Sequence, residues 1–390
     1  FGGLSNGLLG ELLAVLRDKI PNENFKSINE YIRMIAQAIS DMHKHNIRFF
    51  DELVQVLSRD TVEEEPDRLE MRVSYKTRED ASWIRVVERW DRLKEFTETL
   101  NYAMGNVAKN LEKIQDQYRG EPEDLSSVLI SISHAAKYFE EMHHELYAFV
   151  EKPKDNAIYW VEYRRGEFQD QVSINIAPLH VGSEAEKHLW KQNECVILTS
   201  ATLRTANSFE FMIDRLKAYD ADYITVPSPF DYRESTLLYL PTDIPEPTQW
   251  RPYQEMVERG IIELATVLGG RVMVLFTSYS HLEETARSIA PRLALGNINV
   301  LDQSSGGSRQ NLLDAFVEQE KAVLMGTRSF WEGVDVHGAD LSAVIITRLP
   351  FSVPSDPVFA ARSETYGNQS FLNYSIPDAI LRFRQGFGRL

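Results

Sequence analysis

Apolar positions follow two different periods along the chain, and the change comes near residue 155. Up to that point they recur at helical spacing, beginning with the leucines at 8, 12, 13 and 16. Ser27-Ile28-Asn29-Glu30 has the form of a capping box, with Ser27 as the cap of a helix and Glu30 at its third position. Further helices are predicted at about 46–58, 80–118 and 124–150. The first 155 residues therefore predict an antiparallel bundle of four or more helices.

Short breaks separate these helical segments. Residues 69–75 alternate apolar and polar side chains, which predicts an exposed strand. The acidic, proline-containing stretch 61–67 and the tripeptide Gly120-Glu121-Pro122 predict loops. The larger aromatic residues of this region are expected in the core of the bundle rather than on a ligand-binding face. They are Trp83, Trp90, Phe96, Tyr102 and Phe139.

Four histidines of the helical region are candidate metal ligands by residue type: His43, His45, His143 and His144. Adjacent residues of a helix point to different faces, and no cysteine or carboxylate cluster nearby has the spacing of a ligand set. We therefore predict no metal site in this chain.

A period of two begins at residue 156. Residues 158–163 and 172–176 predict two strands joined by a turn, and residues 184–192 predict a helix. A buried strand is then expected at 195–198, running into Thr199-Ser200-Ala201-Thr202-Leu203. Hydroxyl and backbone N–H groups at the end of a strand can relay hydrogen bonds between two ligands, or they can cap the next element. The segment alone leaves both interpretations open.

From residue 237 strands and helices alternate. Strands are predicted at 237–240, 272–276, 298–301, 322–325 and 343–347. Helices are predicted at about 253–268, 279–290, 308–318, 356–366 and 376–386, with Ser308 as a helix cap. Strands separated by helices of this length indicate βαβ units and a mostly parallel sheet, so the fold class is α/β.

Polar side chains gather where these predicted strands end. Thr277, Ser278 and Tyr279 follow one strand. Arg328, Ser329, Phe330 and Trp331 follow another, leading into Glu332, Gly333 and Asp335, and Thr347 and Arg348 follow a third. Carboxyl ends of parallel strands share one edge of the sheet, and hydroxyls, arginines and aromatics together suit a phosphate backbone with stacked bases. Taken alone, residues 323–338 fit an ordinary strand and loop equally well.

Composition sets wider limits. A chain of 390 residues is long enough for two or three domains, and its formal charge of −16 argues against a uniformly basic surface while allowing a local basic groove. The single cysteine excludes an internal disulfide, and no apolar run approaches the roughly 18–20 residues of a membrane span. We expect a cytoplasmic protein. Because the sequence begins with Phe1 and stops abruptly at Leu390, we also expect a fragment of a longer protein.

The last residues combine basic and glycine-rich chemistry. They read Arg382-Phe383-Arg384-Gln385-Gly386-Phe387-Gly388-Arg389-Leu390. Arginines near a helix end can simply complement the helix dipole. An arginine held beside glycines can instead reach a phosphoryl group on a neighbouring domain. A complete phosphate-binding loop of the form G-x-x-x-x-G-K-[ST] does not occur in the sequence.

Three of these stretches, in this order, resemble motifs III, V and VI of superfamily 2 helicases: T-S-A-T-L at 199–203, G-T-R-S-F-W-E-G-V-D-V-H-G at 326–338 and Q-G-F-G-R at 385–389. The form S-F-W-E-G-V-D, with L-P-F at 349–351 and P-S-D-P at 354–357, is similar to the DinG branch of the XPD/DinG family. F-T-S-Y at 276–279 lies where that family has motif IV. The resemblance covers 157–390 by motif and 1–155 only by position.

The resemblance implies a RecA-like parallel sheet with flanking helices, preceded by a mostly helical Arch-like domain. It divides the chain into an Arch-like domain at 1–155, the end of a first motor domain at 156–205 and a second motor domain at 206–390. It also implies an ATP-dependent helicase that moves 5′ to 3′ on single-stranded DNA. ATP and Mg²⁺ would be bound mainly by residues outside this chain, with the first motor domain of the same protein as a partner.

The resemblance also implies roles for individual residues. Arg389 would be an arginine finger, with Gln385 beside it. Glu332, Gly333, Asp335 and Gly388 would contact the nucleotide, and Thr199, Ser200, Ala201 and Thr202 would couple the nucleotide site to the DNA site. The DNA would be bound by Thr277, Ser278, Tyr279, Arg328, Ser329, Phe330 and Trp331.

Departures from the family pattern limit what the chain can do alone. The phosphate-binding loop, the acidic Mg²⁺ motif and the iron–sulfur cysteines of many relatives do not occur, and motif VI stops before its usual second arginine. We therefore predict that this chain alone neither hydrolyses ATP nor unwinds DNA. Two other hypotheses remain open. One is a non-catalytic nucleic-acid-binding protein with a RecA-like fold, and the other is a small-ligand-binding α/β domain fused to a helical interaction module.

Overall fold

The computed structural model describes residues 22–60, 68–117, 123–166, 170–205, 207–228, 231–306, 308–331, 336 and 338–388. The chain folds as two compact units, Phe1–Leu179 and His180–Leu390. Three expected features lie outside the described residues: the leucine-rich helix near 8–16, the loop at 61–67 and the break at 120–122. No helix in the described ranges is long and apolar enough to cross a membrane.

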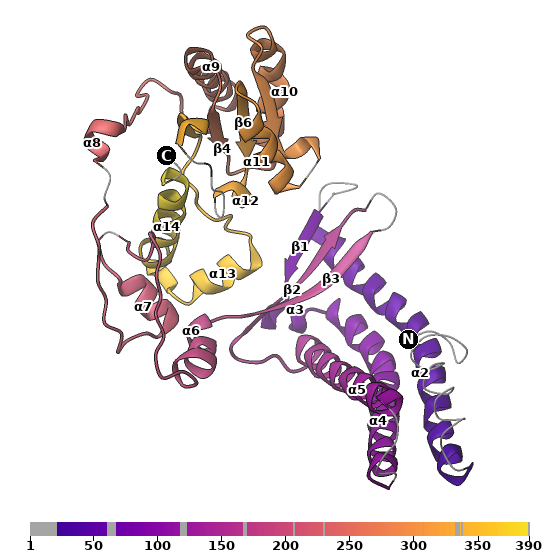
Figure 1. Cartoon of the computed structure of the whole chain (residues 1–390). Coiled ribbons are helices and arrows are strands. Elements are labelled where there is room, and N and C mark those ends of the chain that lie inside the picture. The colour runs from indigo at the N-terminus through magenta and orange to yellow at the C-terminus, as the bar shows by residue number, and fades with distance from the viewer. Residues whose placement is uncertain are drawn as a thin grey trace. The chain divides into compact units, whose positions relative to one another are not determined.

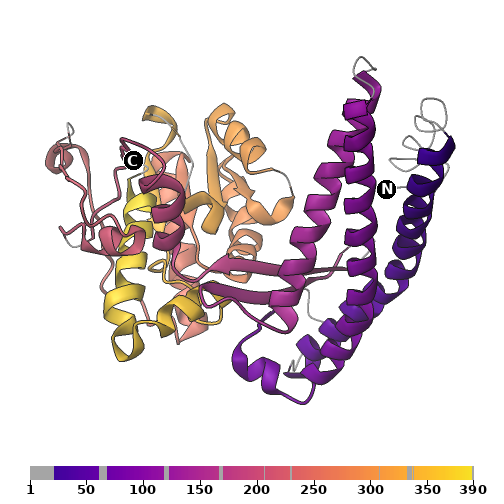
Figure 2. The ribbon, with the colours of Figure 1, turned by 90° about the horizontal axis from the view of Figure 1, so that it is seen from below.

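Three long helices form most of the first unit: α2 (Asn22–Leu57), α4 (Trp83–Gln117) and α5 (Glu123–Val150). Figures 1 and 2 both show α4 and α5 side by side. Ile32 near the start of α2 packs with Met104 late in α4, whereas Leu53 late in α2 packs with Trp83 at the start of α4. The two helices therefore run antiparallel, as their sequence pattern predicts.

Two details of this helical unit differ from the expectation. Residues 22–57 form one continuous helix where two were predicted, so Ser27 lies inside α2 and does not cap a helix. The capping box of this unit is instead at Ser74, whose hydroxyl accepts a hydrogen bond from Thr77 N while its own N–H donates to Thr77 Oγ1. It begins the short helix α3 (Tyr75–Glu79).

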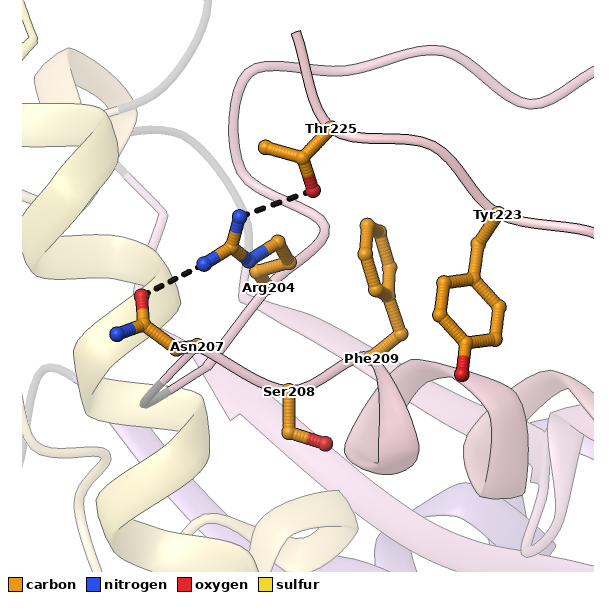
Figure 3. Close-up of a pocket in the computed structure, with 6 residues that line it drawn as sticks. All are labelled: Arg204, Asn207, Ser208, Phe209, Tyr223 and Thr225. Carbon is orange, nitrogen blue, oxygen red and sulfur yellow. Dashed lines mark hydrogen bonds between the residues drawn. The ribbon is translucent and has the colours of Figure 1, made fainter. Parts of the chain in front are cut away.

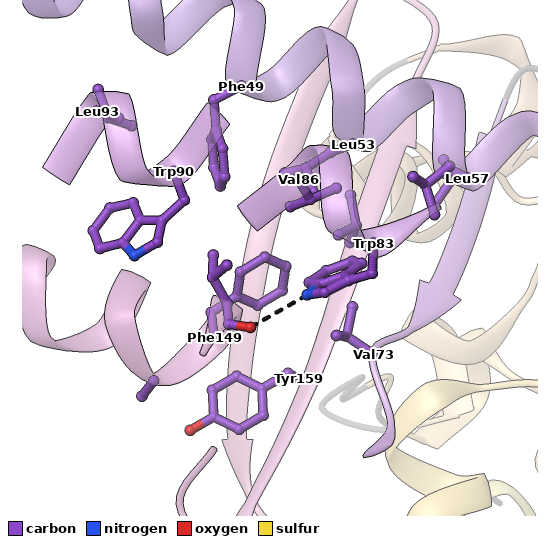
Figure 4. Close-up of a cluster of buried hydrophobic side chains, with 14 residues drawn as sticks. Phe49, Leu53, Leu57, Val73, Trp83, Val86, Trp90, Leu93, Phe149 and Tyr159 are labelled. Carbon is purple, nitrogen blue, oxygen red and sulfur yellow. Dashed lines mark hydrogen bonds between the residues drawn. The ribbon is translucent and has the colours of Figure 1, made fainter. Parts of the chain in front are cut away.

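A three-stranded antiparallel sheet completes the first unit, in the order β1 (Arg68–Arg72), β2 (Ala157–Arg164) and β3 (Gln171–Pro178). The expected alternation at 69–75 thus gives the strand β1. Figure 4 shows the core of this unit, in which Trp83, Phe149 and Tyr159 belong to one buried cluster. The indole N–H of Trp83 donates to the Val150 carbonyl at 3.2 Å, so the buried polar group of this ring is satisfied.

Most of the aromatic residues that were expected in the core of the helical unit are buried there. Trp83, Trp90 and Phe139 are buried, and Phe96 is half-buried. Tyr102 is 59% exposed and stands edge-on to Tyr31, so the prediction is wrong for this residue. Its position on α4 faces away from the apolar stripe.

His143 belongs to the packing of the helical unit. Its Nδ1 lies 2.7 Å from the hydroxyl of Thr97, and its ring lies beside the Trp90 ring. Burial lowers the pKa of His143 below its ordinary value. This environment favours the neutral imidazole, which is hydrogen-bonded to Thr97 and packs against Trp90.

The second unit is built on a parallel sheet in the order β5 (Asn299–Asp302), β6 (Ala322–Gly326), β4 (Val272–Leu275) and β7 (Ala343–Ile346). The sheet is buried on both sides. Val272 and Val274 face the helices α9 (Trp250–Leu268) and α10 (Tyr279–Ala294), whereas Met273 and Leu275 face α11 (Arg309–Glu318) and the segment around Trp331. Continuous apolar runs such as 272–275 are the pattern that such two-sided burial requires.

The remaining helices of this unit are short, apart from α14 (Ile376–Phe387). They are α6 (Val181–Ala185), the π-helix η2 (Glu186–Trp190), α7 (Glu210–Leu216), α8 (Tyr232–Ser235), α12 (Arg328–Trp331) and α13 (Pro357–Glu364). Ser308 caps α11 by accepting a hydrogen bond from Asn311 N, as predicted, and Asp356 caps α13.

Two predicted strands do not form. Residues 195–198 and 237–240 have no strand structure, and their apolar side chains are exposed, reaching 91% at Leu237. A strand forms only where a neighbour pairs with its backbone N–H and C=O groups. In the described part of the sheet, the ladder ends at β5 on one side and β7 on the other.

Asp378 links distant parts of this unit. This buried carboxylate on α14 accepts contacts from Arg382 at 2.9 Å, from Arg215 of α7 at 3.4 Å and from the Ser352 hydroxyl at 3.2 Å. A buried charge is tolerated when it is paired and hydrogen-bonded in this way. The ion pair with Arg215 fixes α7 against α14, and the hydrogen bond from Ser352 fixes the segment at 352.

Candidate functional site at the carboxyl edge of the parallel sheet

The polar segments predicted from the sequence follow neighbouring strands. β4 pairs in parallel with both β6 and β7, so the residues that follow these three strands share one edge of the sheet. Thr277–Tyr279 follow β4, Thr327–Ser329 follow β6, and Thr347 and Arg348 follow β7. The helix α12 begins at Arg328, with Thr327 alone between it and the end of β6 at Gly326. The structure therefore brings these segments together, as the parallel topology predicts.

A close contact sets the turn after β6. The ring of Phe330 packs directly on Gly326, so that a Cβ on Gly326 would lie only 2.3 Å from the Phe330 Cγ. The backbone N–H of Phe330 donates to the Thr327 carbonyl at 2.8 Å and closes the turn. Any larger residue at 326 would push the ring and the following helix away from the sheet.

Trp331 joins this turn to the neighbouring strand. Its indole N–H donates to the carbonyl of Phe276 at 3.0 Å, immediately before Thr277. Phe330 and Trp331 are 0% and 3% exposed and belong to the core under the sheet. The prediction that these two rings contact DNA is therefore wrong for this arrangement, because buried rings offer no face to a base. They support the polar residues at the edge instead.

Gln303 was not among the predicted site residues, but it forms hydrogen bonds with several residues at this edge of the sheet. Its side-chain oxygen accepts hydrogen bonds from the backbone N–H and the hydroxyl of Thr327, at 3.0 and 2.8 Å. Its side-chain N–H donates to the hydroxyl of Ser329 at 3.2 Å, and its carbonyl accepts from Tyr279 Oη at 3.4 Å. Gln303 follows β5, so the rule that identified the other segments predicts this position when it is applied to that strand as well.

The groups that face solvent at this edge include hydroxyls and two arginines, Arg328 and Arg309, the second of which donates to the Ser329 carbonyl at 3.1 Å. The side chain of Arg328 is 72% exposed and its closest acidic partner is Asp356, at 3.9 Å. Tyr279 and Ser329 are exposed, and Thr277 and Ser278 are half-buried. Ser278 also caps α10, so its hydroxyl is oriented by the His281 N–H. Hydroxyl donors, backbone N–H groups and arginine side chains are the groups that bind a phosphate backbone.

α14 packs against the same edge from behind. Gly386 lies on the indole of Trp331, where a Cβ would come within 2.6 Å of Cε3. Gln385 is half-buried, and the N–H of Gly388 donates to the Arg384 carbonyl at 2.9 Å, which ends the helix. The predicted residues Glu332, Gly333, Asp335 and Arg389 lie outside the described residues.

The structure does not bring the predicted coupling residues to this edge. Thr199, Ser200, Ala201 and Thr202 lie in an exposed segment without regular structure, where the N–H of Thr202 donates to the Ser200 hydroxyl at 3.1 Å. The segment continues to Arg204, whose carbonyl accepts a hydrogen bond from Arg384 of α14 at 2.7 Å. The coupling segment is thus tied to the helix that ends at Gly388.

An aromatic cluster lies behind the edge, between α9 and α10. The His281 ring is 1% exposed and is surrounded by the rings of Trp250, Tyr253 and Phe276. Neither ring nitrogen has a hydrogen-bond partner among the described residues. Burial, reinforced by the positive charge of Arg348, lowers the pKa of His281 to about 4, against the opposing effect of Glu258. His281 is therefore neutral at pH 7.

Within the described ranges, no three side chains of His, Cys, Asp or Glu come together in a way that could hold a metal ion. The groups described at the edge are hydroxyls, amides, arginines and backbone groups.

Comparison with known proteins agrees with this architecture. Residues 261–390 match the helicase C-terminal domain family. The chain is 29% identical over 397 residues to the 3′-5′ exonuclease DinG of Bacillus subtilis, an alignment that covers 98% of this chain and 41% of that protein. It is 34% identical over 235 residues to the ATP-dependent DNA helicase YoaA of Haemophilus influenzae, covering 60% of this chain and 35% of that protein.

A third relative is the ATP-dependent DNA helicase DinG of Photobacterium profundum, 31% identical over 242 residues that cover 59% of this chain and 34% of that protein. The parallel sheet, its polar edge and these matches define a helicase C-terminal domain of the RecA-like α/β class that follows a helical region. More narrowly, these matches support a DinG-like member of the XPD/DinG family. It spans between 34% and 41% of the length of these relatives.

Proposed function

We propose that this chain supplies the second motor half of an ATP-dependent DNA helicase that moves 5′ to 3′ on single-stranded DNA. In this proposal residues 1–155 are an Arch-like domain, 156–205 end the first motor domain, and 206–390 form the second. The first motor domain of the same protein is the partner that completes the nucleotide site.

The DNA strand passes over the carboxyl edge of the parallel sheet. Thr277, Ser278 and Tyr279 contact it from β4, and Arg328 and Ser329 contact it from β6. The exposed guanidinium of Arg328 and the neighbouring hydroxyls support this assignment, since phosphate contacts position a strand without regard to its sequence. Gln303 links these two segments, because its side chain bonds Thr327 and Ser329 while its backbone carbonyl accepts from Tyr279 Oη.

One observation carries the proposal: Trp331 contacts both the DNA-facing segment and α14. Its N–H holds the carbonyl before Thr277, while Gly386 lies on its ring. A shift of α14 therefore displaces the indole and, through it, the start of the segment at 277–279. This is the physical link that a motor needs between its nucleotide end and its track, because closely packed groups transmit displacements.

The nucleotide side is assigned to residues near the end of α14. Gln385 and Gly388 fit a nucleotide-facing position, since α14 ends there with an exposed glycine and a half-buried amide side chain. Bound ATP with Mg²⁺ supplies the phosphoryl group, and both are held mainly by residues outside this chain. In this proposal Arg389 stabilises the charge that develops on that group, and Glu332, Gly333 and Asp335 contact the nucleotide. Thr199–Thr202 relay the state of this site towards α14.

The proposal is tested on the full-length protein by DNA-stimulated ATP hydrolysis and by unwinding of duplexes with a 5′ or a 3′ tail. Arg389→Ala should abolish hydrolysis and leave the affinity for single-stranded DNA nearly unchanged. Equal loss of both activities would refute the role of Arg389. This chain alone should neither hydrolyse ATP nor unwind DNA, and hydrolysis by the isolated chain would contradict the division of labour proposed here.

A second candidate function is 3′-5′ exonuclease activity. It is favoured by one observation, namely that the alignment with the Bacillus protein named for that activity covers nearly all of this chain. The measurement is degradation of a strand labelled at its 5′ end, with and without ATP. Shortening of the strand without ATP, in a protein that unwinds neither tailed duplex, would favour the exonuclease over the helicase.

A further inference from the structure

A separate cavity of about 390 Å³ lies in the second unit, beside the segment that leads away from Thr199–Thr202. It is lined by Arg204, Asn207, Ser208, Phe209, Tyr223 and Thr225. Its size falls in the range of about 300–1,000 Å³ that small-molecule sites occupy. Nothing in the proposed DNA track or at the end of α14 uses these side chains.

The arginine in this cavity is held in place from three sides. Figure 3 shows its guanidinium between Thr225 and Asn207. One terminal nitrogen donates to the Thr225 hydroxyl at 2.9 Å and the other to the Asn207 side-chain oxygen at 2.6 Å. The backbone carbonyl of Arg204 accepts from Arg384. The Nε atom is buried and has no partner among the described residues, whereas each terminal nitrogen carries a second N–H beyond the one that it donates.

Two aromatic rings form the adjacent wall. The rings of Phe209 and Tyr223 lie 4.9 Å apart at an angle of 37°, and the Arg204 guanidinium lies over Phe209 at 5.9 Å. Tyr223 is 67% exposed, so one face of its ring is open to a further flat group. Aromatic and guanidinium planes with one open face are the surfaces on which nucleobases stack.

Asn207 supplies the polar edge of the site at some conformational cost. Its backbone has φ of 70°, in the left-handed region that costs a non-glycine residue of order 1 kcal/mol. Its side-chain oxygen accepts the hydrogen bond that holds the Arg204 guanidinium over the Phe209 ring.

The lining of the cavity is mostly uncharged. Arg204 is the single basic residue among the six that line it, and the others offer aromatic rings, hydroxyls and an amide. These are groups that suit an uncharged base.

From this arrangement we propose that the cavity binds a nucleobase stacked on the open face of Tyr223, whose other face is supported by Phe209 and, beyond it, by the Arg204 guanidinium. The base comes either from a free nucleotide or from a strand of DNA. The proposal deepens the proposed function, on which it rests, by adding a base-binding site that is tied through Arg384 to the helix ending at Gly388.

The test compares ligands that differ only in the base, using calorimetric titration of the protein. One arm compares ATP with inorganic tripolyphosphate, and the other compares an oligothymidylate with an abasic oligonucleotide of equal length. Tyr223→Ala should weaken one base-containing ligand by about 5- to 100-fold, the range for loss of one base stack. Binding of the base-free partner should not change. The arm that responds identifies the source of the base.

A matched control is Tyr219→Ala, since Tyr219 is similarly exposed at 65% but does not line the cavity. Arg204→Lys keeps the charge but removes the planar fork, and it should act in the same direction as Tyr223→Ala. Both exposed tyrosines should be replaceable without loss of the thermal transition, which is recorded for each variant. If Tyr223→Ala and Arg204→Lys behave like Tyr219→Ala in both arms, the inference is overturned.

Arg328→Ala separates this inference from the proposed function. It removes a contact to phosphate, so it should weaken the oligothymidylate and the abasic strand alike. If Arg328→Ala has no effect while Tyr223→Ala responds, the proposed DNA track fails and the base site stands. If Arg328→Ala weakens both strands and Tyr223→Ala has no effect, the proposed DNA track stands and the proposed base site is refuted.

Discussion

Gly386 of α14 lies so close to the indole of Trp331 that a Cβ there would come within 2.6 Å of Cε3 and 2.8 Å of Cζ3. A glycine inside a helix is destabilising by roughly 0.5–1 kcal/mol relative to alanine. Its presence here is explained by the contact, because only a residue without a side chain lets α14 approach the ring.

We expect Gly386→Ala to destabilise the second unit despite the better helix propensity of alanine. The added methyl group meets both the indole and Leu275 Cδ1, at 3.2 Å, and overpacking of this kind costs about 1–3 kcal/mol. Denaturant unfolding measures the change. The control is Gly260→Ala in α9, where a Cβ meets nothing within 4 Å and the same substitution should stabilise. Stabilisation by both would show that the contact at Trp331 is loose.

Gln303→Ala should weaken binding of single-stranded DNA by about 3- to 10-fold, because the loss of its hydrogen bonds releases Thr327 and Ser329 from their positions. Fluorescence anisotropy with a labelled oligonucleotide gives the affinity. Gln310→Ala is the matched control, since Gln310 bonds only to Asp314 on the exposed face of α11 among the contacts described. Equal effects of the two substitutions would argue against a positioning role for Gln303.

Arg328→Ala should change the salt dependence of DNA binding as well as its strength. Removing one phosphate contact on a single strand makes the slope of log K against log salt less negative by about 0.7. Titrations at several salt concentrations measure this slope. Arg259→Ala provides the comparison, because Arg259 is an exposed arginine on α9 paired with Glu263. An unchanged slope in Arg328→Ala would remove this residue from the track.

Stability should fall as the pH is lowered from about 6.5 to about 4, in part because of His281. Its pKa in the folded protein is about 4, so the unfolded chain takes up a proton at this position first. The difference corresponds to about 3 kcal/mol at the acidic end of this window. Above the unfolded pKa the contribution of His281 is fully present and constant.

The check is denaturant unfolding between pH 4 and 7.5 in the parent protein and in His281→Leu, whose profile should be flatter. His143, which burial shifts in the same direction, is kept in both proteins and cancels from the comparison. His188→Leu, at an exposed position on η2, controls for the loss of a histidine as such. A profile of His281→Leu that matches the parent would show that His281 titrates as in the unfolded chain.

The sequence predicts the parallel sheet well, because runs such as 272–275 and 322–326 are apolar throughout and are separated by helical segments. It fails at 195–198 and 237–240, which are equally apolar. The composition of these segments does not explain why some form strands and others do not. Apolar composition shows that a segment should be buried, but a strand also needs a neighbouring strand, and local pattern carries no information about that partner.

Local sequence pattern is also insufficient to predict which way side chains point at the site. The carboxyl-end rule places Thr277, Ser278, Arg328 and Ser329 at one edge, and the topology agrees. The rule cannot tell an aromatic ring that faces DNA from one that faces the core, so Phe330 and Trp331 were assigned to the wrong side. The reason lies in Gly326 and Gly386, whose missing side chains open the space that these rings fill. That complementarity is tertiary and appears only when the elements are packed.

The ion pairs at Asp378 have a consequence for the speed of unfolding. They join Arg215 to Asp378 across 163 residues of chain, so closing this contact requires a long loop to be ordered first. Contacts of such separation are expected to form after the folding barrier has been crossed. We therefore expect a substitution at Arg215 to accelerate unfolding and to leave the folding rate almost unchanged. The lifetime of the native second unit, more than its rate of formation, depends on this one carboxylate.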